Sequence, residues 1–182
     1  MARFIVAVLM AFFVVGCATV PESIKGTDEE VLSDYTMVKA GGEALKGKEI
    51  RLGGVIASVQ NLKDNSVIEV VSFPLTSGAR PNPDADAQGR FLANVKGFID
   101  PVQYAKGRLI TVLGHYAGTQ EGKVGEYRYT FPVIDSTGSQ LWRVQQRIIM
   151  DDINSGLGCP WGGCIGFGIG VSTGRVQTVI TP

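Results

Sequence analysis

The sequence is poor in the residues that most often carry chemistry. Its 182 residues include one histidine, three cysteines and 8% aromatic residues, and its 17 basic residues balance its 17 acidic residues. One histidine excludes a multi-histidine metal site and disfavours a histidine-driven hydrolase. A net charge of zero argues against nucleic acid as a partner, because such binders need a basic face that releases counterions. We therefore predict a protein that is not an enzyme, with no metal and no cofactor.

Long hydrophobic runs are also lacking. The run at the amino terminus, residues 4–15, contains twelve apolar residues. As a helix it spans about 18 Å, well short of the roughly 30 Å hydrocarbon core of a bilayer. Arg3 precedes this run, and Val14-Val15-Gly16-Cys17 follows it. Charge, a short apolar core and small residues are typical of a signal peptide. We predict that residues 1–16 form one, rather than a spanning anchor.

Cys17 indicates the kind of signal peptide. An aliphatic residue at position 14 and Gly16 directly before the cysteine resemble the lipobox of bacterial lipoproteins. That resemblance implies a diacylglyceride on Cys17, cleavage before it and a further acyl chain, such as palmitate, on the new amino terminus. Several acyl chains hold a protein in a membrane. Ala18 stands where an aspartate marks inner-membrane retention, which favours the outer membrane. We predict a lipidated tether over residues 17–45.

The rest of the chain is organised as short strands. Helical periodicity is weak, with short helices expected at best near residues 31–38 and 151–152, and 24 glycines and eight prolines favour turns. Residues 76–89 are predicted to form an exposed loop, and Gly53-Gly54 predicts a bulge in the first strand. Residues 46–150 therefore predict a small OB-like β-barrel of five to six strands, with a two-sheet sandwich as the alternative. The β-rich runs are residues 49–59, 66–73, 90–95, 109–116, 127–134 and 140–144.

The carboxy-terminal part has an unusual composition. Residues 153–174 contain no charge and eight glycines, and residues 165–171 alternate glycine with large apolar residues. We predict a Gly-rich hairpin over residues 151–182. In an oxidising compartment Cys159 and Cys164 either close a tight disulfide loop or remain two free thiols. Trp161 and Phe167 are candidate contacts with a membrane or an envelope protein. The alternative is a last strand pair packed on the barrel.

Several blocks resemble the Slp outer-membrane lipoprotein family, in the same order along the chain. The resemblance implies an outer-membrane lipoprotein associated with starvation or stress, and it supplies no catalytic residues. The matching blocks are residues 47–56, 69–71, 74–75, 89–93, 97–101, 107–112, 132–133 and 141–142, with Tyr104, Tyr127 and Tyr129.

Two functional hypotheses remain. The first is a non-enzymatic envelope protein with a structural or partner-contacting role. The second is a lipid-anchored module that binds a small apolar or peptide ligand on the barrel face through Tyr127, Tyr129 and Trp142. His115 is interpreted as a strand residue rather than a general base. The charged residues Arg90, Asp100 and Arg108 are predicted to brace the turn at residues 98–104.

Overall fold

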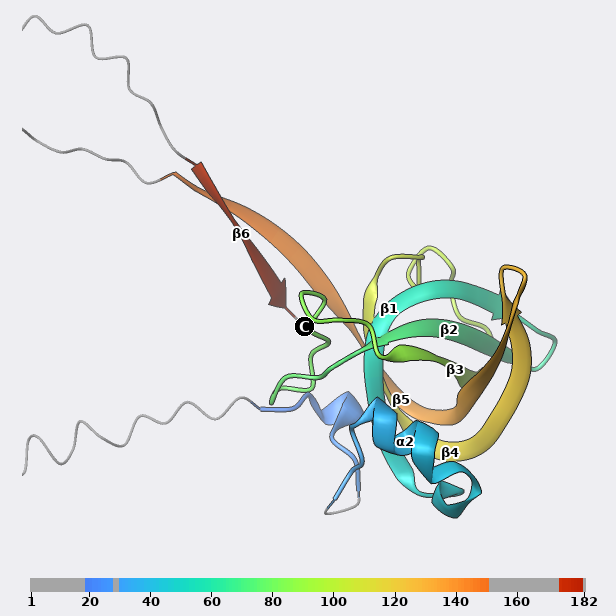
Figure 1. The fold of residues 1–182 in the computed structure, drawn as a ribbon. Coiled ribbons are helices and arrows are strands. Elements are labelled where there is room, and N and C mark those ends of the chain that lie inside the picture. Colours follow the sequence, from blue (N-terminus) through green and yellow to red (C-terminus); the bar gives the residue numbers. More distant parts are fainter. Residues whose placement is uncertain (1–18, 28–29, 151–173, 182) are drawn as a thin grey trace, which may run out of the picture. The chain divides into compact units, whose positions relative to one another are not determined.

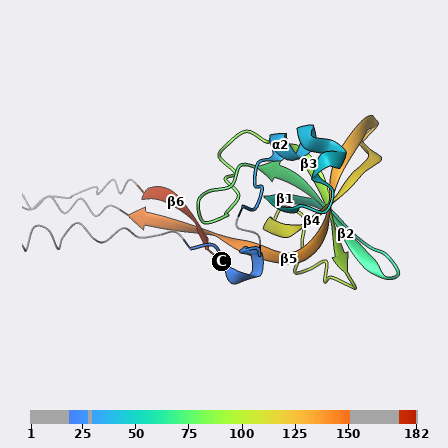
Figure 2. The ribbon, with the colours of Figure 1, turned by 90° about the horizontal axis from the view of Figure 1, so that it is seen from below.

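The structure, a computed structural model, describes residues 19–27, 30–150 and 174–181. It divides into two compact units, of which the first ends at Trp142 and the second comprises Arg143–Thr181. The longest strand, β5 (Tyr127–Met150), contributes to both units (Figures 1 and 2). Within the described residues, no helix is both long enough and apolar enough to cross a bilayer.

Five strands of the first unit close into a ring. The antiparallel order is β3-β2-β1-β4-β5, and a parallel pairing of β3 with β5 joins the two ends. This connectivity confirms the predicted OB-like barrel and excludes the sandwich. In the second unit, β6 (Gly174–Thr181) pairs antiparallel with the last eight residues of β5. The other ring strands are β1 (Glu49–Asn61), β2 (Asn65–Phe73), β3 (Gly89–Lys96) and β4 (Leu109–Val124).

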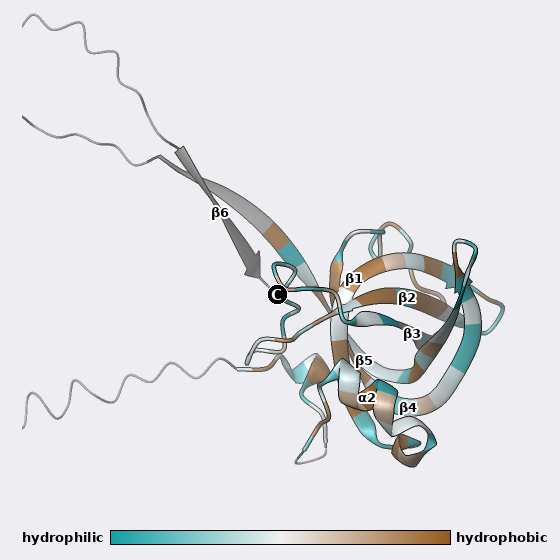
Figure 3. Cartoon of the chain, in the orientation of Figure 1, coloured by the Kyte–Doolittle hydropathy of each residue, from teal (hydrophilic) through white to brown (hydrophobic). Residues whose placement is uncertain are grey.

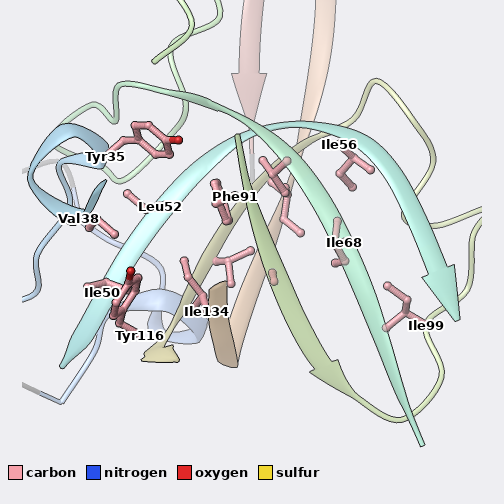
Figure 4. Close-up of a cluster of buried hydrophobic side chains, with 14 residues drawn as sticks. Tyr35, Val38, Ile50, Leu52, Ile56, Ile68, Phe91, Ile99, Tyr116 and Ile134 are labelled. Atoms are coloured by element: carbon pink, nitrogen blue, oxygen red, sulfur yellow. The ribbon is translucent and has the colours of Figure 1, made fainter. Parts of the chain in front are cut away.

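The main hydrophobic core lies inside this ring. Alternate residues of a strand point to opposite faces, and the inward set is fully buried, including Ile68 on β2 and Phe91 on β3. Tyr35 and Val38 lie at one end of the core, and Ile99, from the turn between β3 and β4, lies at the other (Figure 4). Buried residues alternate strictly in β2, and β3 places Phe91 and Ala93 on its inner face, which is why these two strands were predicted to within one residue at each end.

A second set of apolar side chains lies on the outer face of the ring. Leu92, Phe131 and Val133 are at most 8% exposed and form a separate cluster, which Val67 and Tyr129 help to cover. Leu92 points away from the core because its neighbours on β3 are core residues. The cluster is therefore built where the β4–β5 hairpin lies over β2 and β3.

The predicted bulge at Gly53-Gly54 is wrong. Both glycines keep their pairing with β2 and β4, and the register of β1 against β2 shifts between Ile56 and Ser58 instead. Close approach explains the glycine at position 54. A Cβ there would lie 1.7 Å from the carbonyl oxygen of Val71 on the neighbouring strand, so the two strands require a bare backbone at this point.

Strands β4 and β5 are longer than the sequence predicted. The pairing of β4 with β5 runs from Leu109–Trp142 to Val124–Tyr127, with register shifts at Leu113/Gly114 and Tyr116/Gly118. The gap predicted between residues 134 and 140 is absent because β4 supplies partners throughout. The second half of β4, residues 117–124, was not predicted as a strand because it carries mostly hydrophilic residues, as Figure 3 shows.

The first described residues are packed on the barrel. A short 3-10 turn, η2 (Glu22–Ile24), buries Ile24 completely. The Arg51 guanidinium donates to the carbonyl oxygens of Ile24, at 2.7 Å from Nε, and of Lys25. A Cβ on Gly138 would lie 2.0 Å from the carbonyl oxygen of Ser23, so β5 also approaches this segment closely. Residues 22–27 therefore belong to the barrel unit, whereas the sequence predicted a tether here.

The helix predicted near residues 31–38 begins at Tyr35, four residues later than expected. Asp34 caps α2 (Tyr35–Gly41), because its Oδ1 accepts hydrogen bonds from the backbone amides of Thr36 and Met37 at 2.7 and 3.1 Å. The helix continues into a second 3-10 turn, η3 (Gly42–Leu45), which leads into β1.

Two further expectations need correction. Residues 76–89 are only partly exposed, since Ala79 is 2% exposed and its carbonyl accepts a hydrogen bond from Thr111 Oγ1 at 2.7 Å. The three charged residues do not form one brace. Arg90 pairs with Glu69 on β2, whereas Arg108 donates to the carbonyl of Gln103 and Asp100 Oδ1 accepts from the amide of Val102.

Candidate functional site

The structure does not bring the three predicted ligand-face aromatics onto one surface. Tyr127 is 76% exposed and lies at the β4–β5 turn, whereas Trp142 is 3% exposed at the other end of the ring portion of β5. The Trp142 indole donates to Thr111 Oγ1 at 2.9 Å. Trp142 is therefore buried, and its polar atom already has a partner in Thr111, whose hydroxyl in turn donates to the carbonyl of Ala79.

Tyr129 is engaged in an internal network. Its hydroxyl lies 3.0 Å from the hydroxyl of Tyr35, and both oxygens accept the backbone amide of Arg90. Burial raises the pKa of the Tyr35 phenol, and the hydrogen bond with Tyr129 raises it further. The Tyr129 ring packs on Phe131, with centroids 4.7 Å apart. The network joins α2, β3 and β5, so Tyr129 has a structural role.

A groove crosses the outer face of the ring. It consists of two adjoining cavities of about 450 and 880 Å³, which share Asn65 and Asn94 as lining residues. We call this the β3–β5 groove, because both cavities lie along the parallel pairing that closes the ring. The smaller cavity is lined by Ser58, Gln60, Leu62, Asn65, Val67, Glu69, Leu92, Asn94, Gln120, Gly122, Lys123 and Phe131. The larger one is lined by Asn65, Asn94, Val95, Lys96, His115, Asp135, Ser136, Thr137, Gly138 and Ser139.

Carboxamides are the prominent polar groups of the groove. Asn94 Nδ2 donates to Asp135 Oδ1 at 2.9 Å, which fixes one carboxamide across the ring closure. Within the described part of the chain, the side chains of Gln60, Asn65 and Gln120 form no hydrogen bond, so their donors and acceptors face solvent. The floor beneath the smaller cavity is the outer cluster around Leu92 and Phe131.

The larger cavity contains histidine, aspartate and hydroxyl side chains without a catalytic arrangement. Ser136 Oγ donates to the carbonyl of Gly138, and Thr137 Oγ1 donates to the carbonyl of Leu113. Ser139 Oγ lies 3.4 Å from the Tyr104 hydroxyl. Among the residues that the structure describes, no hydrogen bond joins His115 to a hydroxyl, although nucleophilic catalysis requires such a pair.

Metal binding has no support in the same region. Among residues 19–27, 30–150 and 174–181 no three histidine, cysteine, aspartate or glutamate side chains gather closely enough to hold a metal ion.

Elsewhere on the barrel, burial lowers the pKa of Arg51, against the opposing effect of nearby Glu49. The Arg51 guanidinium is committed to the docked amino-terminal segment and is a structural group.

The remaining predicted residues lie outside the described part of the chain. These are the lipidation candidate Cys17, the cysteines Cys159 and Cys164, and the contact candidates Trp161 and Phe167. The sequence reasoning missed the groove residues altogether. A signal was available for Asn94, a polar residue between the apolar Ala93 and Val95 of a predicted strand, whereas Asn65 and Gln120 have polar neighbours in the sequence. Only the closure of the ring shows that they share one surface.

The fold and the site define a small OB-like barrel with a groove and no catalytic constellation among the described residues. Residues 14–164 match the outer membrane lipoprotein Slp family. The chain belongs to this family, and the predicted outer-membrane localisation is thereby confirmed.

Two relatives from Escherichia coli (strain K12) are clearly similar. The uncharacterized lipoprotein YeaY is 37% identical over 183 residues, covering 97% of this chain and 94% of that protein. The outer membrane protein Slp is 31% identical over 138 residues, covering 75% and 73%. No solved structure matches the chain.

Proposed function

We propose that this outer-membrane lipoprotein is anchored by acyl chains on Cys17 and acts without catalysis, as a structural or partner-contacting component of the envelope. The observation that carries the proposal is the docking of residues 22–27 on the barrel. Ser23 Oγ donates to Gln140 Oε1 at 3.0 Å, and Thr27 N donates to the buried Glu49 carboxylate at 2.8 Å. Ser23 is the sixth residue after Cys17, so at 3.3–3.6 Å per residue the anchor lies within about 22 Å of the barrel surface.

Metabolic labelling tests the anchor. Cells that express the protein receive an alkyne analogue of palmitate, and incorporation into the purified chain is measured. We expect label in the unmodified protein and none in Cys17→Ser. The matched control is Cys159→Ser, which removes a cysteine from the same chain and should retain the label. Label that persists in Cys17→Ser would contradict the proposal.

The short distance to the bilayer is tested by lengthening it. Thirty Gly/Ser residues inserted between Val20 and Pro21 add a coil of about 30 Å root-mean-square length and leave Cys17 in place. In a strain that lacks the gene, we expect the unmodified protein to restore survival in starved stationary phase and the extended protein to fail. This survival defect also tests the starvation role. Full rescue by the extended protein would contradict the requirement for proximity.

The carboxy-terminal segment is the proposed contact with an envelope partner or the membrane. Its support is the uncharged run of residues 153–174 with Trp161 near its centre. A photo-reactive amino acid at position 161 in living cells tests the assignment. One discrete protein adduct indicates a partner, and lipid adducts alone indicate a membrane contact. Absence of any adduct would refute a contact at this position. Intact mass after alkylation without reductant reports whether Cys159 and Cys164 are paired.

A further inference from the structure

The β3–β5 groove has the place and size of a ligand site. It lies on the face of β2 and β3, between the β1–β2 turn at residues 62–64 and the β4–β5 hairpin. Barrels with OB connectivity bind oligonucleotides or oligosaccharides on this face. Its two cavities, of about 450 and 880 Å³, fall in the range of small-ligand sites, about 300–1,000 Å³. The chemistry of the lining residues decides between the two ligand classes.

Charge excludes the oligonucleotide. The formal charges along the groove are Lys96 and Lys123 against Glu69 and Asp135. Single-stranded nucleic acid requires a positively charged track for its phosphates and aromatic faces on which the bases stack. The groove provides neither, since Phe131, its aromatic lining residue, is only 4% exposed.

An extended peptide is also disfavoured. Peptides that lie on sheets gain most of their affinity by pairing with an open strand edge. Here β3 and β5 pair with each other at Leu92–Val133, Ala93–Ile134 and Asn94–Asp135, so the ring has no open edge at the middle of the groove. A ligand at this point must be recognised by side chains rather than by main-chain pairing.

The side chains available are those that recognise sugars. A carboxamide offers two donors and an acceptor, which match hydroxyl groups that both donate and accept. Gln60, Asn65 and Gln120 point such groups toward solvent, and among the described residues none of the three has an intramolecular partner. Leu62, which is 49% exposed, and the partly buried Val67 line the same cavity and supply an apolar surface for the C–H faces of a sugar ring. We propose that the β3–β5 groove binds an extended, uncharged oligosaccharide.

Side-chain amide signals provide the test. The full acylated protein is labelled with ¹⁵N and purified in dodecylphosphocholine, a detergent without sugar. It is titrated to about 5 mM with four uncharged tetrasaccharides, built from N-acetylglucosamine, glucose, galactose or mannose. We expect at least one to shift the carboxamide signals of Gln60, Asn65 and Gln120. Absence of a shift with all four, or stronger binding of an octadeoxynucleotide or an octapeptide, would overturn the proposal.

Substitutions then assign binding to the groove. Gln60→Ala combined with Asn65→Ala removes two ligand-facing carboxamides, and we expect the affinity for the bound tetrasaccharide to fall about tenfold or more. Gln88→Ala removes an exposed carboxamide outside the groove and should change affinity less than about twofold. Equal losses in both variants would refute the site. Oligosaccharide binding in the groove does not depend on acylation of Cys17. A failure of the binding experiment would therefore not affect the proposed anchor, and a failure of the labelling experiment would not affect the proposed site.

Discussion

The inside and the outside of the ring bury apolar side chains in different ways. Inside, fourteen residues form one cluster in which most members are fully buried, and their positions follow the alternation of each strand. Outside, Leu92, Phe131 and Val133 retain up to 8% exposure and depend on covering by the β4–β5 hairpin. Which residues are buried inside the ring thus follows from the local sequence pattern. Which residues are buried on the outer face depends on the segment, distant in the sequence, that covers them. The outer face can therefore carry a groove without loss of the fold.

The largest effect is expected inside the ring. Phe91→Ala removes a fully buried ring from the main core, and we expect the free energy of unfolding to fall by about 3–5 kcal/mol, since the closed barrel cannot collapse onto the cavity. Urea denaturation followed by circular dichroism measures the loss. A loss below about 1 kcal/mol would show that the interior is more plastic than its burial indicates.

The matched substitution outside the ring should cost less. Phe131→Ala removes the same ring from the outer cluster, where the groove lets water and the hairpin fill the space. We expect a loss of about 2 kcal/mol, below the range of about 3–5 kcal/mol for fully buried aromatic residues. If Phe131→Ala and Phe91→Ala destabilise the protein equally in the same urea experiment, the distinction between the two faces fails.

A polar contact of the outer face comes next. Trp142→Phe keeps an aromatic ring at this buried position but removes the donor to Thr111 Oγ1. We expect a loss of about 1 kcal/mol, the net worth of one hydrogen bond. Thermal unfolding of the variant checks it. In a double-mutant cycle, Thr111→Val should destabilise the Trp142→Phe variant less than it destabilises the unmodified protein, because the hydrogen bond between the two side chains is already lost.

The smallest effect concerns the partly buried ion pair between Arg90 and Glu69. The Arg90 and Glu69 side chains are 31% and 20% exposed, so solvent screens their attraction. We expect Glu69→Gln to cost less than about 1 kcal/mol and the difference to shrink in about 1 M salt, where the Debye length is about 3 Å. Urea midpoints at low and high salt report this. A difference that is independent of salt would assign the effect to the hydrogen bond from Ser58.

The sequence predicted what local pattern controls. The alternation in β2 and β3 and the order of the β-rich runs were sufficient for the OB-like barrel, and the short helix was displaced by the cap at Asp34. It did not predict the aromatic positions, because the burial of Trp142 depends on contacts that are distant in the sequence, such as its hydrogen bond to Thr111, 31 residues earlier. The groove was missed for the same reason. Its lining residues come from β1 to β5, and only the β3–β5 pairing places them together.

The β3–β5 pairing, which closes the ring, is the place where we expect the barrel to open locally. β3 and β5 share three residue pairs, whereas β1 shares eight with β2 and seven with β4. Local openings that expose backbone amides to exchange begin where the fewest bonds must break. Amide protons at Asn94 and Asp135 should therefore exchange with deuterium sooner than those in the middle of β1. Asn94 also lines the groove, so a ligand bound in the groove would hold β3 and β5 together. The exchange of these amides should then slow when the ligand binds, and the exchange rate reports how much of the site is occupied without a label on the ligand.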